Sequence, residues 1–99
     1  MEKLTRDQIN RKISSMEGWT LEGDFIVKEF QTKNWKTTIF LVNAIASLAE
    51  AHWHHPDLEV SFKKVKVKLT THEAGGITER DFRLAEDIDR LITDIMKHS

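Results

Sequence analysis

The chain has 99 residues, of which 39% are hydrophobic and 31% are charged, and its 15 Lys and Arg against 16 Asp and Glu leave a formal net charge of −1. This length predicts a single domain over residues 1–99 with one small core, because a domain usually takes on the order of 100 residues or more. The near-balanced charge argues against binding to nucleic acid or to an anionic membrane. Because the chain has no cysteine, it has no disulfide, no thiol nucleophile and no cysteine-ligated zinc.

The sequence also predicts a soluble, cytoplasmic protein. The first residues carry no apolar segment of the kind that forms a signal peptide. The longest uncharged stretch, residues 37–49, is too short to span a bilayer. A core this small has to be stabilised by packing, or by a second copy that extends it.

The first third of the chain predicts a helix followed by a hairpin. Thr5 and Gln8 have the spacing of a capping box, which starts a helix that Gly18 would end. Gly23-Asp24 is typical of a turn between two short strands, the second covering residues 25–30.

Residues 34–53 predict the second helix, and Pro56 closes it. Its expected apolar stripe has residues three or four positions apart: Trp35, Ile39, Val42, Ala46 and Ala49. Trp35 is therefore expected in the core, and so is Trp19, the first residue of the alternating stretch 19–22 that predicts the first strand.

The next hairpin is indicated by a change of parity. The apolar residues of 58–62 lie at even positions, whereas those of 65–69 lie at odd positions, and one straight strand cannot place both sets on one face. A two-residue turn at Lys63-Lys64 would pair residue 62 with 65 and residue 58 with 69, and so reunite the two sets. Lys-Lys is poor turn chemistry, so a bulge or a longer bend is the alternative. The lysines at 64, 66 and 68 would line the opposite, solvated face, with an anion-binding surface as the rival interpretation.

The chain closes with a third helix. Gly75-Gly76 interrupts the structure, and Thr78 with Asp81 has capping-box spacing at the start of a helix over 78–97. Its apolar stripe is Phe82, Ala85, Ile88, Leu91, Ile92 and Ile95. The order α-β-β-α-β-β-α predicts an α+β fold of two layers, a four-stranded antiparallel sheet with three helices on one face.

Histidines gather where the second helix meets the second hairpin. Four of the five lie within 21 residues, at positions 52, 54, 55 and 72. Imidazole both donates and accepts protons near neutral pH, which suits acid–base catalysis. If residues 58 and 69 pair, His54, His55 and His72 leave the hairpin at the same end, which predicts one site.

Two other interpretations of this cluster stay open. Histidines at a helix end can be structural, and three histidines suffice for a catalytic zinc. However, the adjacent His54 and His55 are poorly placed to bind one ion together, and His52 and His54 lack the helical spacing of a zinc motif, so no metal is expected. Trp53 could flank a flat ligand or pack into the core.

The spaced residues Glu50, His54-His55-Pro56, Phe62, His72 and Asp81 resemble the motif of the pterin-4a-carbinolamine dehydratases. That motif is a charged residue, three residues, His-His-Pro, an aromatic residue after five or six, a histidine nine further on, and an aspartate after eight or more. Residues 69–81 also resemble the family's second segment. The likeness covers residues 35–92 well and the N-terminal third by pattern only.

The resemblance implies dehydration of a 4a-hydroxytetrahydropterin to quinonoid dihydropterin, which recycles the cofactor of the aromatic amino-acid hydroxylases and needs no cofactor of its own. It implies that His54 and His72 are the catalytic acid–base pair and that His55 binds and orients the pterin. The residues expected around the substrate are Glu50, Trp53, Pro56, Thr71 and Asp81.

The resemblance also implies a homodimer or homotetramer. Some animal members of the family bind a homeodomain transcription factor and stabilise its dimer. The alternative to an enzyme is therefore a non-catalytic module that binds a protein partner.

Overall fold

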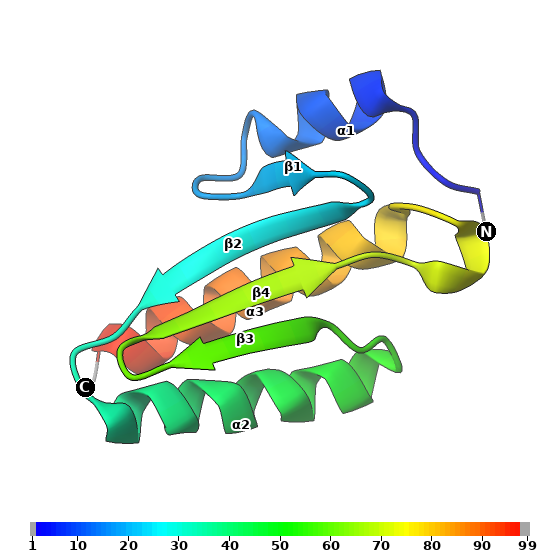
Figure 1. Cartoon of the computed structure of the whole chain (residues 1–99). Coiled ribbons are helices and arrows are strands. Elements are labelled where there is room, and N and C mark those ends of the chain that lie inside the picture. Colours follow the sequence, from blue (N-terminus) through cyan, green and yellow to red (C-terminus); the bar gives the residue numbers. More distant parts are fainter. Residues whose placement is uncertain (1, 98–99) are drawn as a thin grey trace.

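The computed structural model describes residues 2–97. Its elements, in chain order, are α1 (Arg6–Ile13), β1 (Thr20–Glu22), β2 (Phe25–Gln31), α2 (Trp35–His52), β3 (Asp57–Ser61), β4 (Lys64–Leu69), the 3-10 turn η1 (His72–Ala74) and α3 (Glu79–Lys97). Adjacent strands are antiparallel, and the sheet order is β1-β2-β4-β3 (Figure 1). The expected α+β class and element order are confirmed.

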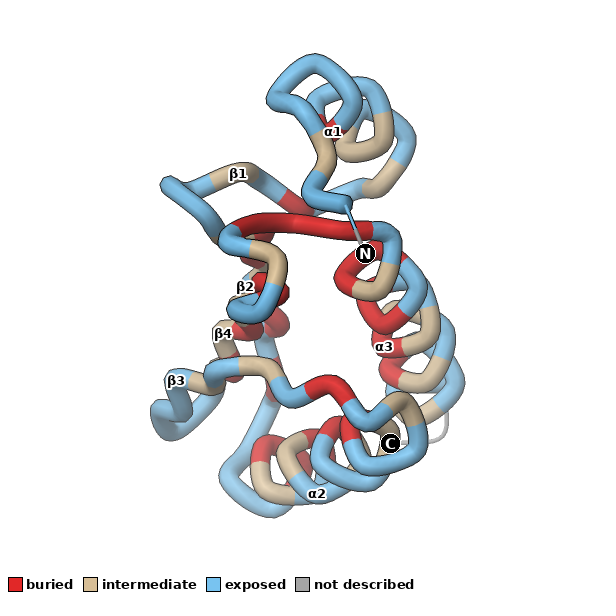
Figure 2. Tube along the Cα trace, turned by 90° about the vertical axis from the view of Figure 1, so that its right-hand side faces the viewer, coloured by how far each residue is buried: buried red, intermediate tan, exposed pale blue. Residues whose placement is uncertain are grey.

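Helices α2 and α3 pack against each other, and α2 contacts β3 and β4, whereas α1 contacts β1 at the edge of the sheet. Figure 2 shows the sheet on one side and α3 and α2 on the other, with buried residues on the surfaces that face each other. α1 contributes Ile9 to the same core, so all three helices pack against one cluster. Among the described residues, no helix combines the length and apolar character that crossing a membrane would require.

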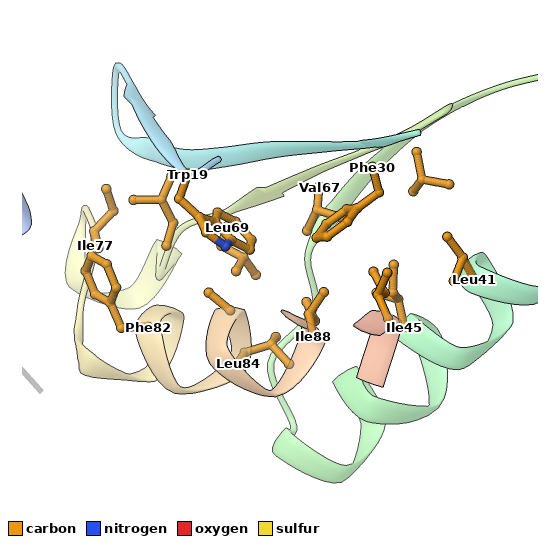
Figure 3. Close-up of a cluster of buried hydrophobic side chains, with 14 of the residues drawn as sticks. Trp19, Phe30, Leu41, Ile45, Val67, Leu69, Ile77, Phe82, Leu84 and Ile88 are labelled. Carbon is orange, nitrogen blue, oxygen red and sulfur yellow. The ribbon is translucent and has the colours of Figure 1, made fainter. Parts of the chain in front are cut away.

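The core lies between the sheet and the two long helices (Figure 3). Val65, Val67 and Leu69 of β4 are fully buried, and so are Leu41 and Ile45 of α2 and Leu84 and Ile88 of α3. Burying such a side chain contributes about 1.5–3 kcal/mol. Trp19 is 2% exposed, which confirms its predicted place in the core.

Helix α1 starts as predicted but ends earlier. The Thr5 side chain accepts from the Gln8 backbone, and the Gln8 side chain accepts from Thr5, which is a complete capping box. The helix ends at Ile13, not at Gly18. Gly18 instead has a φ of 86° and leads the chain into Trp19, a conformation that glycine adopts at little cost.

The predicted core face of α2 was right only in part. Ala49 is buried and Val42 packs against the core, as predicted, but Trp35 is 50% exposed, and the helix buries Thr38, Leu41 and Ile45 instead. Because α2 is apolar on two sides, periodicity could not choose between them. Thr38 is fully buried, and its polar hydroxyl is tolerated there because it lies within hydrogen-bond distance of the carbonyl oxygens of Asn34 and Phe62.

The β3–β4 hairpin unites the two apolar sets on one face, as predicted, but the predicted pairs 62–65 and 58–69 were wrong. Leu58 and Val60 lie opposite Val67 and Val65, because the turn comes one residue earlier. Ser61 pairs with Lys64, so Phe62 and Lys63 form the turn and Phe62 is 62% exposed. The Thr38 hydroxyl donates to the Phe62 carbonyl at 2.8 Å, and the Thr32 amide donates to the Lys63 carbonyl at 2.8 Å. These tertiary bonds position the turn.

The lysines of β4 line the open face of the sheet. Lys64, Lys66 and Lys68 lie 3.7 to 3.9 Å from glutamate carboxylates of the other three strands. The run is therefore a solvated face with balanced charge, as predicted.

Candidate functional site

The site is built around Asp81, a fully buried carboxylate in the first turn of α3. Its Oδ2 accepts from the Thr78 amide at 2.9 Å and from the Thr71 hydroxyl at 2.8 Å, and its Oδ1 lies 2.5 Å from His54 Nε2. The Thr78 contact follows from the predicted capping spacing. A carboxylate removed from water needs such partners, because burying it unpaired costs several kcal/mol or more.

A left-handed residue directs His54 towards Asp81. Helix α2 ends at His52, and Trp53 follows with a φ of 50° as its C-cap. This conformation costs a non-glycine residue about 1–2 kcal/mol. The His54 amide donates to the Ala49 carbonyl at 3.1 Å, which completes the turn, and His54 is 6% exposed.

The two ring nitrogens of His54 face different surroundings. Nε2 makes the hydrogen bond to Asp81. Within residues 2–97 every buried side-chain nitrogen and oxygen has a hydrogen-bond partner, and the structure gives Nδ1 none, so Nδ1 reaches the surface. A carboxylate only accepts, which favours the tautomer with the proton on Nε2 and a free lone pair on Nδ1.

His55, Glu50 and Trp53 form an exposed group at the end of α2, which we call the α2-end cluster. His55 Nε2 lies 2.6 Å from Glu50 Oε2, and the two side chains are 53% and 66% exposed. The rings of Trp53 and His55 meet edge to face, with centroids 5.3 Å apart. Trp53 is 72% exposed, so it does not belong to the core. Pro56, the next residue, leads into β3.

The second half of the site follows β4. Thr71 is 1% exposed, and its hydroxyl also lies 2.9 Å from the Thr78 hydroxyl. The backbones of Thr71 and Gly76 pair and close the loop that contains η1. His72 begins η1 and is exposed, with its ring edge-on to Phe25. His54, Asp81 and Thr71 therefore form one hydrogen-bonded chain that brings His72 to the same end of the sheet.

The fourth clustered histidine lies outside this chain. His52 Nε2 is 2.7 Å from Asp87 Oδ2 on α3, and Asp87 also pairs with Arg90. His52 thus ties the end of α2 to the middle of α3. Among residues 2–97, the side chains of His, Asp and Glu form no group of three that could hold a metal ion.

Sequence reasoning missed Arg80. Its Nη2 donates to the Trp53 carbonyl at 2.6 Å, and its Nη1 lies 3.2 Å from Glu73 Oε2. The hydrogen bond from its own backbone and the nearby Arg80 guanidinium hold the pKa of Glu73 below its usual value. No spacing rule could have indicated these contacts, because they join residues that only the fold brings together. The one signal in the sequence for a role of Arg80 was its position next to Asp81.

Comparison with known proteins gives consistent matches over most of the chain. The family model described as pterin 4 alpha carbinolamine dehydratase matches residues 2–91. A relative from Aquifex aeolicus is 70% identical and covers 97% of both chains. One from Trichodesmium erythraeum is 46% identical and covers 91% of this chain and 97% of its own. Both are named, provisionally, pterin-4-alpha-carbinolamine dehydratases.

Two solved structures share the fold. A crystal structure described as a transcriptional coactivator/pterin dehydratase from Brucella melitensis has a TM-score of 0.84 and 28% identity, and covers 90% of this chain and 97% of its own. A pterin dehydratase-like protein described as a RuBisCO assembly factor in the α-carboxysome has a TM-score of 0.65 and 23% identity, and covers 77% and 90%. The second likeness concerns the fold alone.

Proposed function

This chain belongs to the pterin-4a-carbinolamine dehydratase family, and we propose that it dehydrates a 4a-hydroxytetrahydropterin to quinonoid dihydropterin and water. One observation carries the proposal: a buried carboxylate holds His54 by Nε2 and leaves Nδ1 at the surface, at the end of the sheet where His72 is exposed.

The reaction needs two proton transfers. The C–O bond of the carbinolamine breaks as the hydroxyl takes a proton and leaves as water. The neighbouring ring nitrogen loses its proton, and its electron pair forms the new C=N bond. A positioned acid and a positioned base each contribute about 10²–10⁴-fold to the rate, and imidazoles suit both roles near neutral pH.

In this proposal His54 is the base and His72 is the acid. Asp81 accepts a hydrogen bond from the Nε2–H of His54, so the Nδ1 lone pair is free to take the ring N–H proton of the substrate. The negative charge of Asp81 then stabilises the imidazolium that forms. The exposed His72 delivers a proton to the leaving hydroxyl.

The α2-end cluster is proposed to bind the pterin. Trp53 and His55 offer exposed ring surfaces to a flat heterocycle, and the exposed Glu50 carboxylate can accept hydrogen bonds from a ring N–H or amino group. Pro56 fixes the corner that follows His55, because its ring restricts the backbone. Thr71 acts here through Asp81, and its buried hydroxyl orients the carboxylate.

Stopped-flow absorbance of freshly generated 4a-hydroxytetrahydropterin tests the activity. Wild type should exceed the buffer rate, and His54→Ala and His72→Ala should each lose about 10²-fold or more of that acceleration. His52→Ala is the matched control, because it removes a clustered histidine outside the site, and it should stay within about twofold. A folded wild type that does not exceed the buffer rate would leave the protein-binding module as the better account.

We further propose that a second copy of this chain covers the outward face of α2. Trp35 is 50% and Phe40 is 60% exposed there, beside a hollow of about 850 Å³ at the start of α2 and the end of α3. Lys36 and Asp94 both border the hollow, so the same surface on a second copy related by a two-fold axis can pair opposite charges.

Sedimentation velocity tests this interface. Wild type should sediment as a dimer or larger assembly, and Phe40→Lys should shift it towards monomer, while Lys64→Glu on the open sheet face should not. A wild-type monomer at tens of micromolar would contradict self-association and favour a different protein partner for this face.

A further inference from the structure

Two consecutive residues at the start of α3 bridge the same two segments of the site. Asp81 binds His54 from the segment after α2 and Thr71 from the segment after β4. Arg80 binds the Trp53 carbonyl from the first segment and Glu73 from the second. The buried Asp81 contacts and the more exposed Arg80 contacts lie side by side, because residues 80 and 81 are neighbours in the chain.

Each contact of Arg80 adjoins a histidine. Trp53 directly precedes His54, and its left-handed backbone is the turn that separates that histidine from α2. Glu73 directly follows His72 in η1. The distance between the two histidine-bearing segments is thus set on one side by the Asp81 carboxylate and on the other by the width of the Arg80 guanidinium.

The chemistry of the side chain matters for this role. A guanidinium is planar and presents its donors in a fixed fork, so it can hold a carbonyl and a carboxylate at a defined separation. An ammonium is a compact charge on a flexible stem with three rotatable donors, so it would hold the same two partners with less directional control and at no fixed separation. The side chain of Arg80 is 25% exposed and that of Glu73 is 74% exposed, so solvent weakens the ion pair, and the 2.6 Å bond to the Trp53 carbonyl is the stronger of the two contacts.

Building on the proposed dehydration, we propose that Arg80 is a positioning residue that fixes the spacing between His54 and His72. It donates no proton to the substrate, and its effect is on the rate of the chemical step. A displacement of about 1 Å in a catalytic group can cost up to 10²-fold in rate.

Arg80→Met is the main variant, and Arg83→Met, which removes an exposed arginine from the next turn of α3, is its control. We expect Arg80→Met to lower kcat on the order of 10-fold, with a smaller change in KM, and Arg83→Met to change neither. Arg80→Lys should recover only part of the loss, and millimolar guanidinium should restore part of the rate of Arg80→Met. An unchanged kcat for a folded Arg80→Met would overturn the inference.

A second readout does not depend on activity. The ring resonances of His54 and His72 and the amide exchange of residues 53–55 and 71–75 are compared by NMR between wild type, Arg80→Met and Arg83→Met. We expect faster exchange and shifted rings in Arg80→Met alone. If wild type does not dehydrate the pterin, the proposed function fails, and the positioning role is decided by this measurement: unchanged rings and exchange would overturn it.

Discussion

Two His–Asp pairs join the end of α2 to α3, and they differ in almost everything but their chemistry. His54 and Asp81 are 6% and 0% exposed, and three donors surround the carboxylate. His52 and Asp87 are 22% and 30% exposed, and Asp87 is shared with Arg90. Burial and additional hydrogen-bond donors to the carboxylate therefore fix an imidazole in one orientation, and the presence of a His–Asp pair alone does not. The proposed catalytic role belongs to the buried pair and a structural role to the partly exposed pair.

Replacing the two carboxylates should give the largest difference. Asp81→Asn keeps the shape but puts an amide where the buried charge accepted three hydrogen bonds, so we expect a loss of roughly 3 kcal/mol in the free energy of unfolding. Asp87→Asn should cost about 1 kcal/mol or less, because solvent reaches both side chains of this pair and ion pairs near the surface contribute little. Urea unfolding measures both, and equal losses would mean that burial does not distinguish the pairs.

Removing one of the hydrogen-bond donors around Asp81 should lower the free energy of unfolding by less than replacing the carboxylate does. Thr71→Val leaves the shape almost unchanged but removes the hydroxyl that donates to the carboxylate, and we expect a loss of about 1–2 kcal/mol. Thr93→Val on the exposed side of α3 is the matched control and should stay within about 0.5 kcal/mol. If Thr71→Val were as stable as wild type, the network around Asp81 would not be what holds His54.

Trp53, the residue between His52 and His54, can be changed so that stability rises while substrate binding weakens. Trp53→Gly relieves a left-handed conformation at an exposed residue, so the free energy of unfolding should rise by about 0.5–1 kcal/mol. The same change removes the ring proposed to contact the pterin, so KM should rise. A destabilised Trp53→Gly would show that the indole contributes packing that its exposure does not suggest.

The smallest effect concerns Glu73, whose pKa is lowered first by its backbone hydrogen bond and then by Arg80. A carboxylate with a lowered pKa in the folded state stabilises the protein above its ordinary pKa, and this contribution disappears as the pH falls through the lowered value. Glu73→Gln should therefore be slightly less stable than wild type at pH 7 and equal to it in strong acid. A difference that grows as the pH falls would have the wrong sign.

Much of the fold could be predicted because its signals are local. The capping spacings of Thr5 and Asp81 and the parity change before β4 each specify an element from a few neighbouring residues. Trp35 was misplaced because α2 is apolar on two sides, and which side meets the sheet is decided by tertiary packing.

The candidate site, too, could be predicted from the sequence only in part. The spacing of the histidines and of Asp81 indicated which residues to examine, but not that Asp81 is fully buried or that Thr71 binds it. Arg80 could not be found from spacing, because its partners lie 27 and 7 residues away. The catalytic roles of the histidines stay a prediction, as does the cytoplasmic location.

Nitrogen-15 NMR of the imidazole rings tests whether His54 is held as a base, because it reports which ring nitrogen carries the proton in both His–Asp pairs at once. We expect neutral His54 to hold its proton on Nε2, towards Asp81, and its unprotonated Nδ1 resonance to shift when an unreactive pterin is added. His52 should not respond to the pterin. A neutral His54 protonated on Nδ1, or a pterin response at His52 and none at His54, would contradict the assignment of His54 as the base.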